Sequence, residues 1–191
     1  MNKIISLISI LFVIVFSSCN ELTGTKIIRL GHGLNTSHSV HKGMVHFGEQ
    51  LEELSKGRFK VQIYPSQQLG TERQCVELLQ IGSLDMTKVS AGVLENFAPN
   101  IKVFGIPYMF RDKAHCFSVL DGPIGKELLS GTEQYWLKGL GYYDSGSRSF
   151  YTIDKTLENP NDLDGLKIRV MESQTAIDMV KSLGGSPTPI S

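Results

Sequence analysis

Hydrophobic positions between residues 26 and 90 follow two periods in turn. From Val40 to Leu54, apolar residues recur at spacings of four and three, as they do on one face of an amphipathic helix. In the segment RFKVQIYP, apolar and polar residues alternate, which predicts a half-buried strand that Pro65 ends. Short apolar runs also occur in KIIRLG, before the helix, and in SLDMTKVSAG. Strand and helix therefore alternate, which predicts βαβ units and a largely parallel sheet.

Cap residues mark where several helices begin and end. Gly57 suits the position just after the first helix, where a left-handed backbone is common. Thr71 and Gln74 have the spacing of a capping box at the start of a second helix. Asp112 and Ser173 are candidate N-caps of two later helices. These signals support an α/β fold.

The second half of the chain has a less regular pattern. IKVFGIPYMF predicts an extended apolar segment, and GPIGKELLSG predicts a short helix with Pro123 near its start. LKGLGYYDSGSRSFYT predicts a strand followed by a crossing rich in glycine and serine. GLKIRV predicts another strand, in which Arg169 lies between the apolar Ile168 and Val170. The closing SPTPIS predicts the start of a further element rather than a finished terminus.

Charge and motifs argue against several classes of function. The chain has 191 residues with 19 basic and 19 acidic side chains, whereas nucleic-acid binders usually carry a basic surplus. The motifs H-E-x-x-H, G-x-S-x-G and G-x-G-x-x-G do not occur. His38, His41 and His46 lie on the first helix, but nothing completes a set of metal ligands, so we expect them to cap the helix or face solvent. We predict no nucleic acid, no metal, no cofactor and no enzymatic activity.

Residues 1–19 have the pattern of a secretory signal peptide. A basic start, MNK, precedes the apolar run IISLISILFVIVF, and the small residues SSC follow. The run is short for a membrane-spanning helix, which needs about 20 apolar residues. The ending on Cys19 is similar to a bacterial lipobox, although Phe16 stands where Leu is usual, and it predicts a lipid anchor on Cys19. The alternative is cleavage without a lipid. Residues 20–25 then form a short tether.

Two further cysteines, Cys75 and Cys116, leave two states open. Exported proteins often form disulfides. Cys75, however, lies within a helical pattern among apolar residues, where a free cysteine behaves as a small hydrophobe. Free thiols are therefore favoured.

Five segments, in this order, resemble the substrate-binding proteins of TRAP (tripartite ATP-independent periplasmic) transporters. They are GHGLNTSHSVHKGMVHF, IYPSQQLGTERQCVELLQIGSLDM, PYMFRD, DGLKIRVMES and LGGSPTP. The resemblance implies a periplasmic-binding-protein-like fold of two α/β domains joined by hinge strands. Family members are much longer than this chain, so the resemblance implies an N-terminal portion. Residues 26–147 would form the first domain, and residues 148–191 the incomplete start of the second.

The resemblance also implies that two arginines bind the ligand. In the family, the arginine of the K-x-R-V strand holds the substrate carboxylate, and that position is Arg169 here. The position itself agrees, because ligands of parallel α/β sheets bind at the carboxyl ends of strands and a guanidinium fork fits a carboxylate. From the residues alone, the alternative is a strand-end arginine in a surface ion pair. Arg148 matches a second basic position near the domain crossing; its alternative is an exposed loop arginine.

Three further positions match ligand contacts of the family. Glu72 opens the second helix, where its charge also suits the helix N-terminus. Ser90 aligns with a strand-end contact that is acidic in members that bind sialic acid, which argues against sialic acid as the ligand. His32 follows the first strand and would line the same cleft, or else form a turn with a polar cap.

The resemblance implies an extracytoplasmic solute receptor. It would bind a small organic acid through the carboxylate and deliver it to the integral-membrane TRAP permease, which an ion gradient drives. Two alternatives stay open: a lipid-anchored module that senses a ligand or contacts a partner on the same scaffold, and a fragment without function.

Overall fold

A computed structural model of the chain describes residues 24–191. The predicted signal peptide over 1–19, with Cys19, and most of the predicted tether lie outside the described residues. Within the described part, no helix is both long and apolar enough to cross a membrane.

The first sheet has three strands in the order β2-β1-β3. They are β1 (Lys26–Gly31), β2 (Phe59–Tyr64) and β3 (Met86–Thr87). β1 runs parallel to both neighbours, and Gly31 lies beside Tyr64 on one side and Thr87 on the other. The predicted parallel sheet is therefore confirmed, and the carboxyl ends of all three strands meet at one edge.

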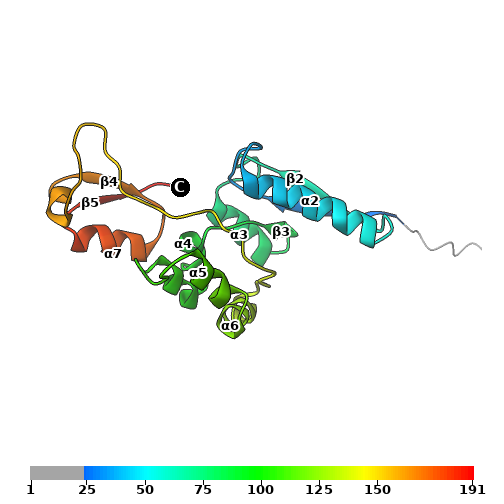
Figure 1. Cartoon of the computed structure of the whole chain (residues 1–191). Coiled ribbons are helices and arrows are strands. Elements are labelled where there is room, and N and C mark those ends of the chain that lie inside the picture. Colours follow the sequence, from blue (N-terminus) through cyan, green and yellow to red (C-terminus); the bar gives the residue numbers. More distant parts are fainter. Residues whose placement is uncertain (1–23) are drawn as a thin grey trace, which may run out of the picture.

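Helix α2 (Ser39–Leu54) lies along β2 and covers the sheet (Figure 1). Its apolar face supplies the buried Val40 and Met44, which pack with Leu30 of β1. Gly48 lets the helix approach closely, since an added Cβ would lie 3.1 Å from Val61 Cβ. The partly buried residues that surround this core are Leu34, Val61, Ile63 and Met86.

The cap signals locate the ends of the first helices, although Gly57 lies one position later than predicted. α2 ends in a Schellman motif, in which the Gly57 N–H donates to Glu52 O at 2.8 Å. Gly57, with a φ of +77°, occupies the second position after the cap, because Lys56 takes the first with a φ of 55°. α3 (Glu72–Gln80) opens with the predicted capping box between Thr71 and Gln74.

The middle of the chain is helical. It contains α4 (Ala91–Leu94), η1 (Pro99–Gly105), α5 (Lys113–Leu120), α6 (Pro123–Ser130) and η2 (Glu133–Tyr135). Asp112 caps α5 and Pro123 opens α6, as predicted. The extended segment predicted from residue 101 was wrong, since it begins within the 3₁₀ helix η1. Pro99 pre-sets the backbone for this helix, and Ile101 becomes buried.

The prediction of a strand after residue 136 was also wrong. Residues 137–159 form no strand. This segment packs against helix α6 instead of a sheet. The Tyr142 hydroxyl donates to Gly125 O at 2.8 Å, and the Gly139 N–H donates to Thr132 Oγ1 at 3.1 Å. A side chain at Gly139 would come within 3.0 Å of Leu129 Cα, so glycine is needed for this close packing.

A second, two-stranded sheet lies near the C-terminus. It consists of the parallel strands β4 (Lys167–Val170) and β5 (Ser186–Pro189), with α7 (Gln174–Ser182) between them and the short η3 (Pro160–Leu163) before. Ser173 caps α7 as predicted, accepting from the Ala176 N–H at 3.0 Å. The two sheets lie in different parts of the molecule, with α4 and α5 between them (Figure 1). The domain boundary at 147/148 falls in the irregular segment and stays a prediction.

Candidate functional site

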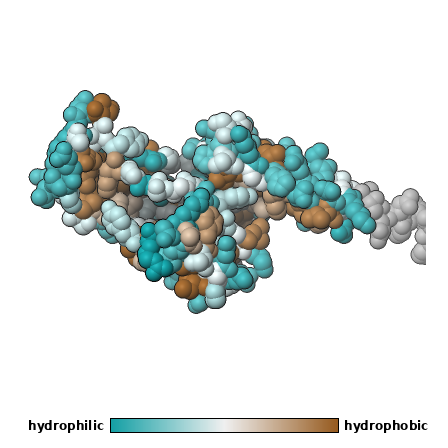
Figure 2. Space-filling view, in the orientation of Figure 1, coloured by the Kyte–Doolittle hydropathy of each residue, from teal (hydrophilic) through white to brown (hydrophobic). Residues whose placement is uncertain are grey.

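A cavity of about 240 Å³ lies where the two parts of the molecule face each other. The surface is hollowed between the part built on β1–β3 and the part built on β4 and β5 (Figure 2). Most of the lining comes from the start of α3 and from segments that follow the strands: Gly33, Leu34, Gln67, Glu72, Arg73, Lys88, Ser90, Val93, Arg148, Arg169, Met171, Glu172, Ile190 and Ser191. This is where parallel α/β sheets bind ligands.

Arg169 reaches the cavity from β4. Alternation along the strand buries Val170 and leaves Arg169 exposed on the other side. Its Nη2 donates to the main-chain oxygen of Ile190 at 2.7 Å, just beyond β5. Within residues 24–191, no carboxylate forms an ion pair with Arg169. Its remaining N–H groups can therefore serve an anion in the cavity.

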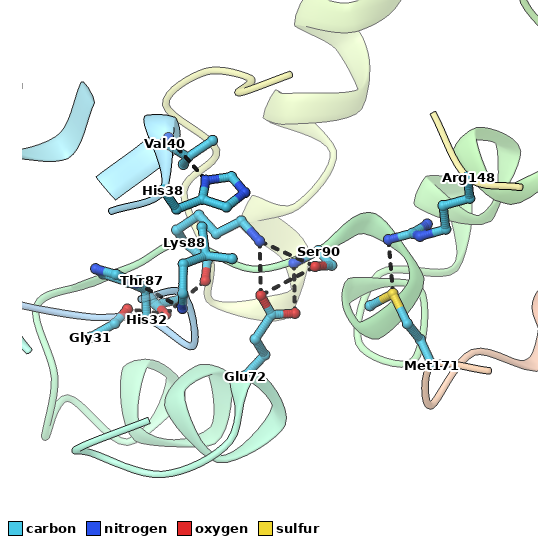
Figure 3. A network of polar contacts seen from close by, with 11 residues as sticks. Gly31, His32, His38, Val40, Glu72, Thr87, Lys88, Ser90, Arg148 and Met171 are labelled. Carbon is cyan, nitrogen blue, oxygen red and sulfur yellow. Dashed lines mark hydrogen bonds and ion pairs between the residues drawn. The ribbon is translucent and has the colours of Figure 1, made fainter. Parts of the chain in front are cut away.

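Arg148 lines the same cavity from the irregular segment. Its Nη2 contacts Met171 Sδ at 2.8 Å (Figure 3). A thioether is only a weak acceptor. None of the ion pairs among the described residues includes Arg148. Two guanidiniums that have no carboxylate partner among the described residues thus lie at one cavity, a combination that suits a carboxylate ligand.

Glu72, Lys88 and Ser90 form a compact polar cluster in the first wall (Figure 3). Glu72 Oε1 accepts from Lys88 Nζ at 2.9 Å, and Glu72 Oε2 accepts from the Ser90 N–H at 3.0 Å. Lys88 Nζ also donates to Ser90 Oγ at 3.2 Å. The charges of Glu72 and Lys88 therefore cancel. The two side chains and the Ser90 hydroxyl still line the cavity.

Lys88 is one of the charged lining residues that the sequence reasoning missed. It directly follows β3, and the Thr87 hydroxyl holds this strand end by donating to Gly31 O at 2.8 Å. The signal was available, because a polar side chain just past the carboxyl end of a parallel strand faces the ligand edge of the sheet.

His32 does not reach the cavity wall. It is only 1% exposed and lies behind Gly33 and Leu34, which do line the cavity. Its Nδ1 accepts the Leu34 N–H at 3.1 Å, so the ring proton sits on Nε2 and is donated to His41 Nδ1 at 3.0 Å. Burial, then the neighbouring His41 and Lys88, lower the pKa of His32 to about 4. The expectation that His32 lines the cleft is therefore not supported; the ring braces the loop that does.

Other expected features have different outcomes. His38 caps α2, because its Nδ1 accepts the Val40 N–H at 3.1 Å. Cys75 and Cys116 are free thiols, as favoured from the sequence, and burial raises the pKa of both. Across residues 24–191, no three His, Cys, Asp or Glu side chains gather where they could hold a metal ion.

Comparison with known proteins identifies close similarities. The model of the family described as "Bacterial extracellular solute-binding protein, family 7" matches residues 30–191. YiiZ of Salmonella typhimurium is 42% identical over 169 residues, 88% of this chain and 51% of YiiZ. The chain spans about half the length of the curated relatives it matches.

Two solved structures are similar over most of the chain. A TRAP periplasmic solute-binding protein of Xanthobacter autotrophicus with bound β-D-galacturonate is 36% identical, with a TM-score of 0.82 over 85% of this chain and 54% of that protein. One of Anaerococcus prevotii with bound D-glucuronate is 37% identical, with a TM-score of 0.84 over 87% of this chain and 54% of that protein. The fold is thus that of TRAP periplasmic binding proteins, of which this chain covers about half.

Proposed function

Because the chain belongs to family 7 of the bacterial extracellular solute-binding proteins, we propose that the protein is an extracytoplasmic receptor for a small organic acid. The chain spans about half the length of its relatives, so this function belongs to the whole protein. The receptor binds the acid and releases it unchanged, without catalysis. Closure around the ligand is the functional event, and the ligand favours the closed state through contacts that only this state offers.

The observation that carries the proposal is the pair of guanidiniums at one cavity. Arg148 and Arg169 come from different segments, and neither has a carboxylate partner among the described residues. A guanidinium presents parallel N–H groups that can bond both oxygens of a carboxylate. Partial enclosure by two walls strengthens this attraction relative to open water.

The polar cluster supports a hydroxylated acid. Glu72 offers carboxylate oxygens as acceptors, whereas Lys88 and Ser90 offer donors, and the net charge of this group is zero. Hydroxyl groups both donate and accept, so a sugar acid suits such a surface. The galacturonate and glucuronate bound to the two related proteins agree with this class.

The proposed partner is a TRAP-type permease in the cytoplasmic membrane, to which the loaded receptor delivers its ligand. The proposed location is the periplasm, with a lipid on Cys19 as the membrane anchor. The family and the leader-like pattern of residues 1–19 support these assignments.

Calorimetric titration of the full-length protein tests the proposal. D-galacturonate, D-glucuronate and succinate would be compared with D-galactose, the neutral counterpart of galacturonate. We expect at least one acid to bind and D-galactose to give no heat of binding. Binding of D-galactose as tightly as of the acids would contradict a carboxylate receptor.

A further inference from the structure

We propose that Glu95 is a positioning residue that fixes one wall of the cavity against the other. Glu95 directly follows α4 in the first part of the molecule and is only 7% exposed. A buried carboxylate needs hydrogen-bond donors. Those of Glu95 come from the opposite part of the chain.

The donors belong to the start of α7. Glu95 Oε1 accepts from Ser173 Oγ at 2.9 Å and from the Thr175 N–H at 2.9 Å. Ser173 is the N-cap of α7, and Thr175 is the second residue of the helix. A helix N-terminus offers unpaired N–H groups and the positive end of the helix dipole, so an anion suits this position. Glu95, which lies 78 positions before Ser173 in the chain, thus completes the cap of α7.

The same short helix connects this contact to the cavity. Ser90 and Val93, at and within α4, line the first wall, and Glu95 lies only two residues beyond Val93. Asn96 Nδ2 donates to the main-chain oxygen of Glu172, which lines the second wall, at 2.7 Å. The distance between Arg169 in the second wall and the polar cluster around Ser90 in the first wall therefore depends on how α4 is held against Ser173.

The contact between α4 and the start of α7 leaves little room for another packing arrangement. A Cβ added at Gly92, in the middle of α4, would lie 3.2 Å from Ser173 Cβ. Glu95 Oε2, in turn, is buried without a hydrogen-bond partner among the described residues. Leaving a buried carboxylate oxygen without a hydrogen bond lowers the stability of the fold. Local stability therefore does not explain why a glutamate stands here. The two hydrogen bonds that join the walls account for a carboxylate at this position.

Distance measurement between the two parts tests this role without any ligand. Spin labels would be attached in the full-length protein at the exposed positions Lys60 in β2 and Lys181 in α7, each changed to cysteine. Cys19 and Cys116 would be changed to serine. Pulsed electron resonance then gives the distribution of label separations.

Glu95→Ala should broaden this distribution about twofold, because the walls lose their shared anchor. Glu95→Gln retains an acceptor oxygen for both donors and should restore a distribution close to that of the unchanged protein. If Glu95→Ala does not fold, Ser173→Ala, which removes one of the two bonds, should give a smaller broadening. An unchanged width in the folded variant would overturn the proposal.

The matched control is Thr132→Val. Thr132 is 3% exposed, and its hydroxyl makes hydrogen bonds with Leu129 O and Leu137 O within the first part. This variant should lower the melting temperature without broadening the distribution. Equal broadening in Thr132→Val would show general loosening and would also overturn the proposal. The readout needs no ligand, so its outcome is separate from that of the proposed function.

Discussion

Lys88 Nζ lies 2.9 Å from Glu72 Oε1, and the two side chains are only 10% and 15% exposed. The pair therefore meets at the cavity with little water around it, where charges interact more strongly than on an open surface. Its net charge is zero, whereas Arg148 and Arg169 bring two positive charges to the same cavity. The guanidiniums suit a carboxylate, and the neutral pair suits the hydroxyl groups of a hydroxylated acid.

Glu72→Gln should shift the preference of the receptor toward dicarboxylates. The amide keeps an acceptor oxygen but removes the negative charge, so the Lys88 ammonium becomes free to attract a second carboxylate. We expect the affinity for succinate, relative to D-glucuronate, to rise about tenfold. Calorimetry with both acids measures this ratio. Glu49→Gln, an exposed change of the same kind on α2, is the control and should leave the ratio unchanged.

Arg169→Ala should weaken binding of the acid by about 2–5 kcal/mol, as expected when one member of an enclosed charge pair is lost. Arg169→Lys keeps the charge but not the planar fork, so its affinity should be intermediate. Lys167→Ala is the matched control, because Lys167 is exposed on the same strand but does not line the cavity. Equal affinities for Arg169→Ala and Lys167→Ala, measured by calorimetry, would refute the role of Arg169.

Elements with a local signal were predictable from the sequence. The periodic pattern of α2, the alternation of β2 and the capping box of α3 each depend on neighbouring residues, and all three are present. The segments that start at residues 101 and 137 were mispredicted as extended, because apolar runs take their conformation from what they pack against. Packing against α4 and α6 decided these two cases, and no local pattern records it.

β5 illustrates a different limit, since its prolines argue against a strand. In the parallel pair, the Ser186 N–H donates to Leu166 O, just before β4, and the Ile190 N–H, just after β5, donates to Val170 O at the end of β4. Pro187 and Pro189 occupy the alternate positions, whose nitrogens point away from β4. Proline is tolerated there because no ladder bond is lost on the paired side.

The residues of the candidate site came from the family resemblance, and their role in binding stays a prediction. Arg169, Arg148, Glu72 and Ser90 all line one cavity. His32 does follow the first strand, as predicted. Whether a residue at that position lines the cleft or is buried depends on the loop that covers it. Glu95 carried no signal at all, since its partners lie 78 and 80 residues later.

The two thiols should be free and poorly reactive in the folded protein. Cys75 is 1% exposed, and burial raises the pKa of both Cys75 and Cys116, which reduces the reactive thiolate. With a thiol reagent at mildly alkaline pH, the Cys19→Ser protein should show slow reaction of Cys116 and none of Cys75. Unfolding in urea should expose both. Failure of either thiol to react after unfolding would indicate a disulfide instead.

The buried His32 should make stability depend on pH. Its folded-state pKa of about 4 lies below the ordinary value of 6.5, so between these values the unfolded chain binds a proton that the folded chain does not. Stability should therefore rise as pH rises from about 4 to 6.5 and be lost as pH falls through this range, by up to about 3 kcal/mol. Urea denaturation at several pH values measures this slope.

His32→Gln removes this titration, so its slope over the same range should be flatter than that of the unchanged protein. The control is His46→Gln, because His46 is an exposed histidine on α2 and its loss should leave the slope intact. Since His32 Nδ1 accepts the Leu34 N–H, protonation of the ring also breaks a bond that holds the cavity loop. Ligand affinity should consequently fall with stability below about pH 5 in the unchanged protein. A slope shared equally by His32→Gln and His46→Gln would assign the dependence to other groups.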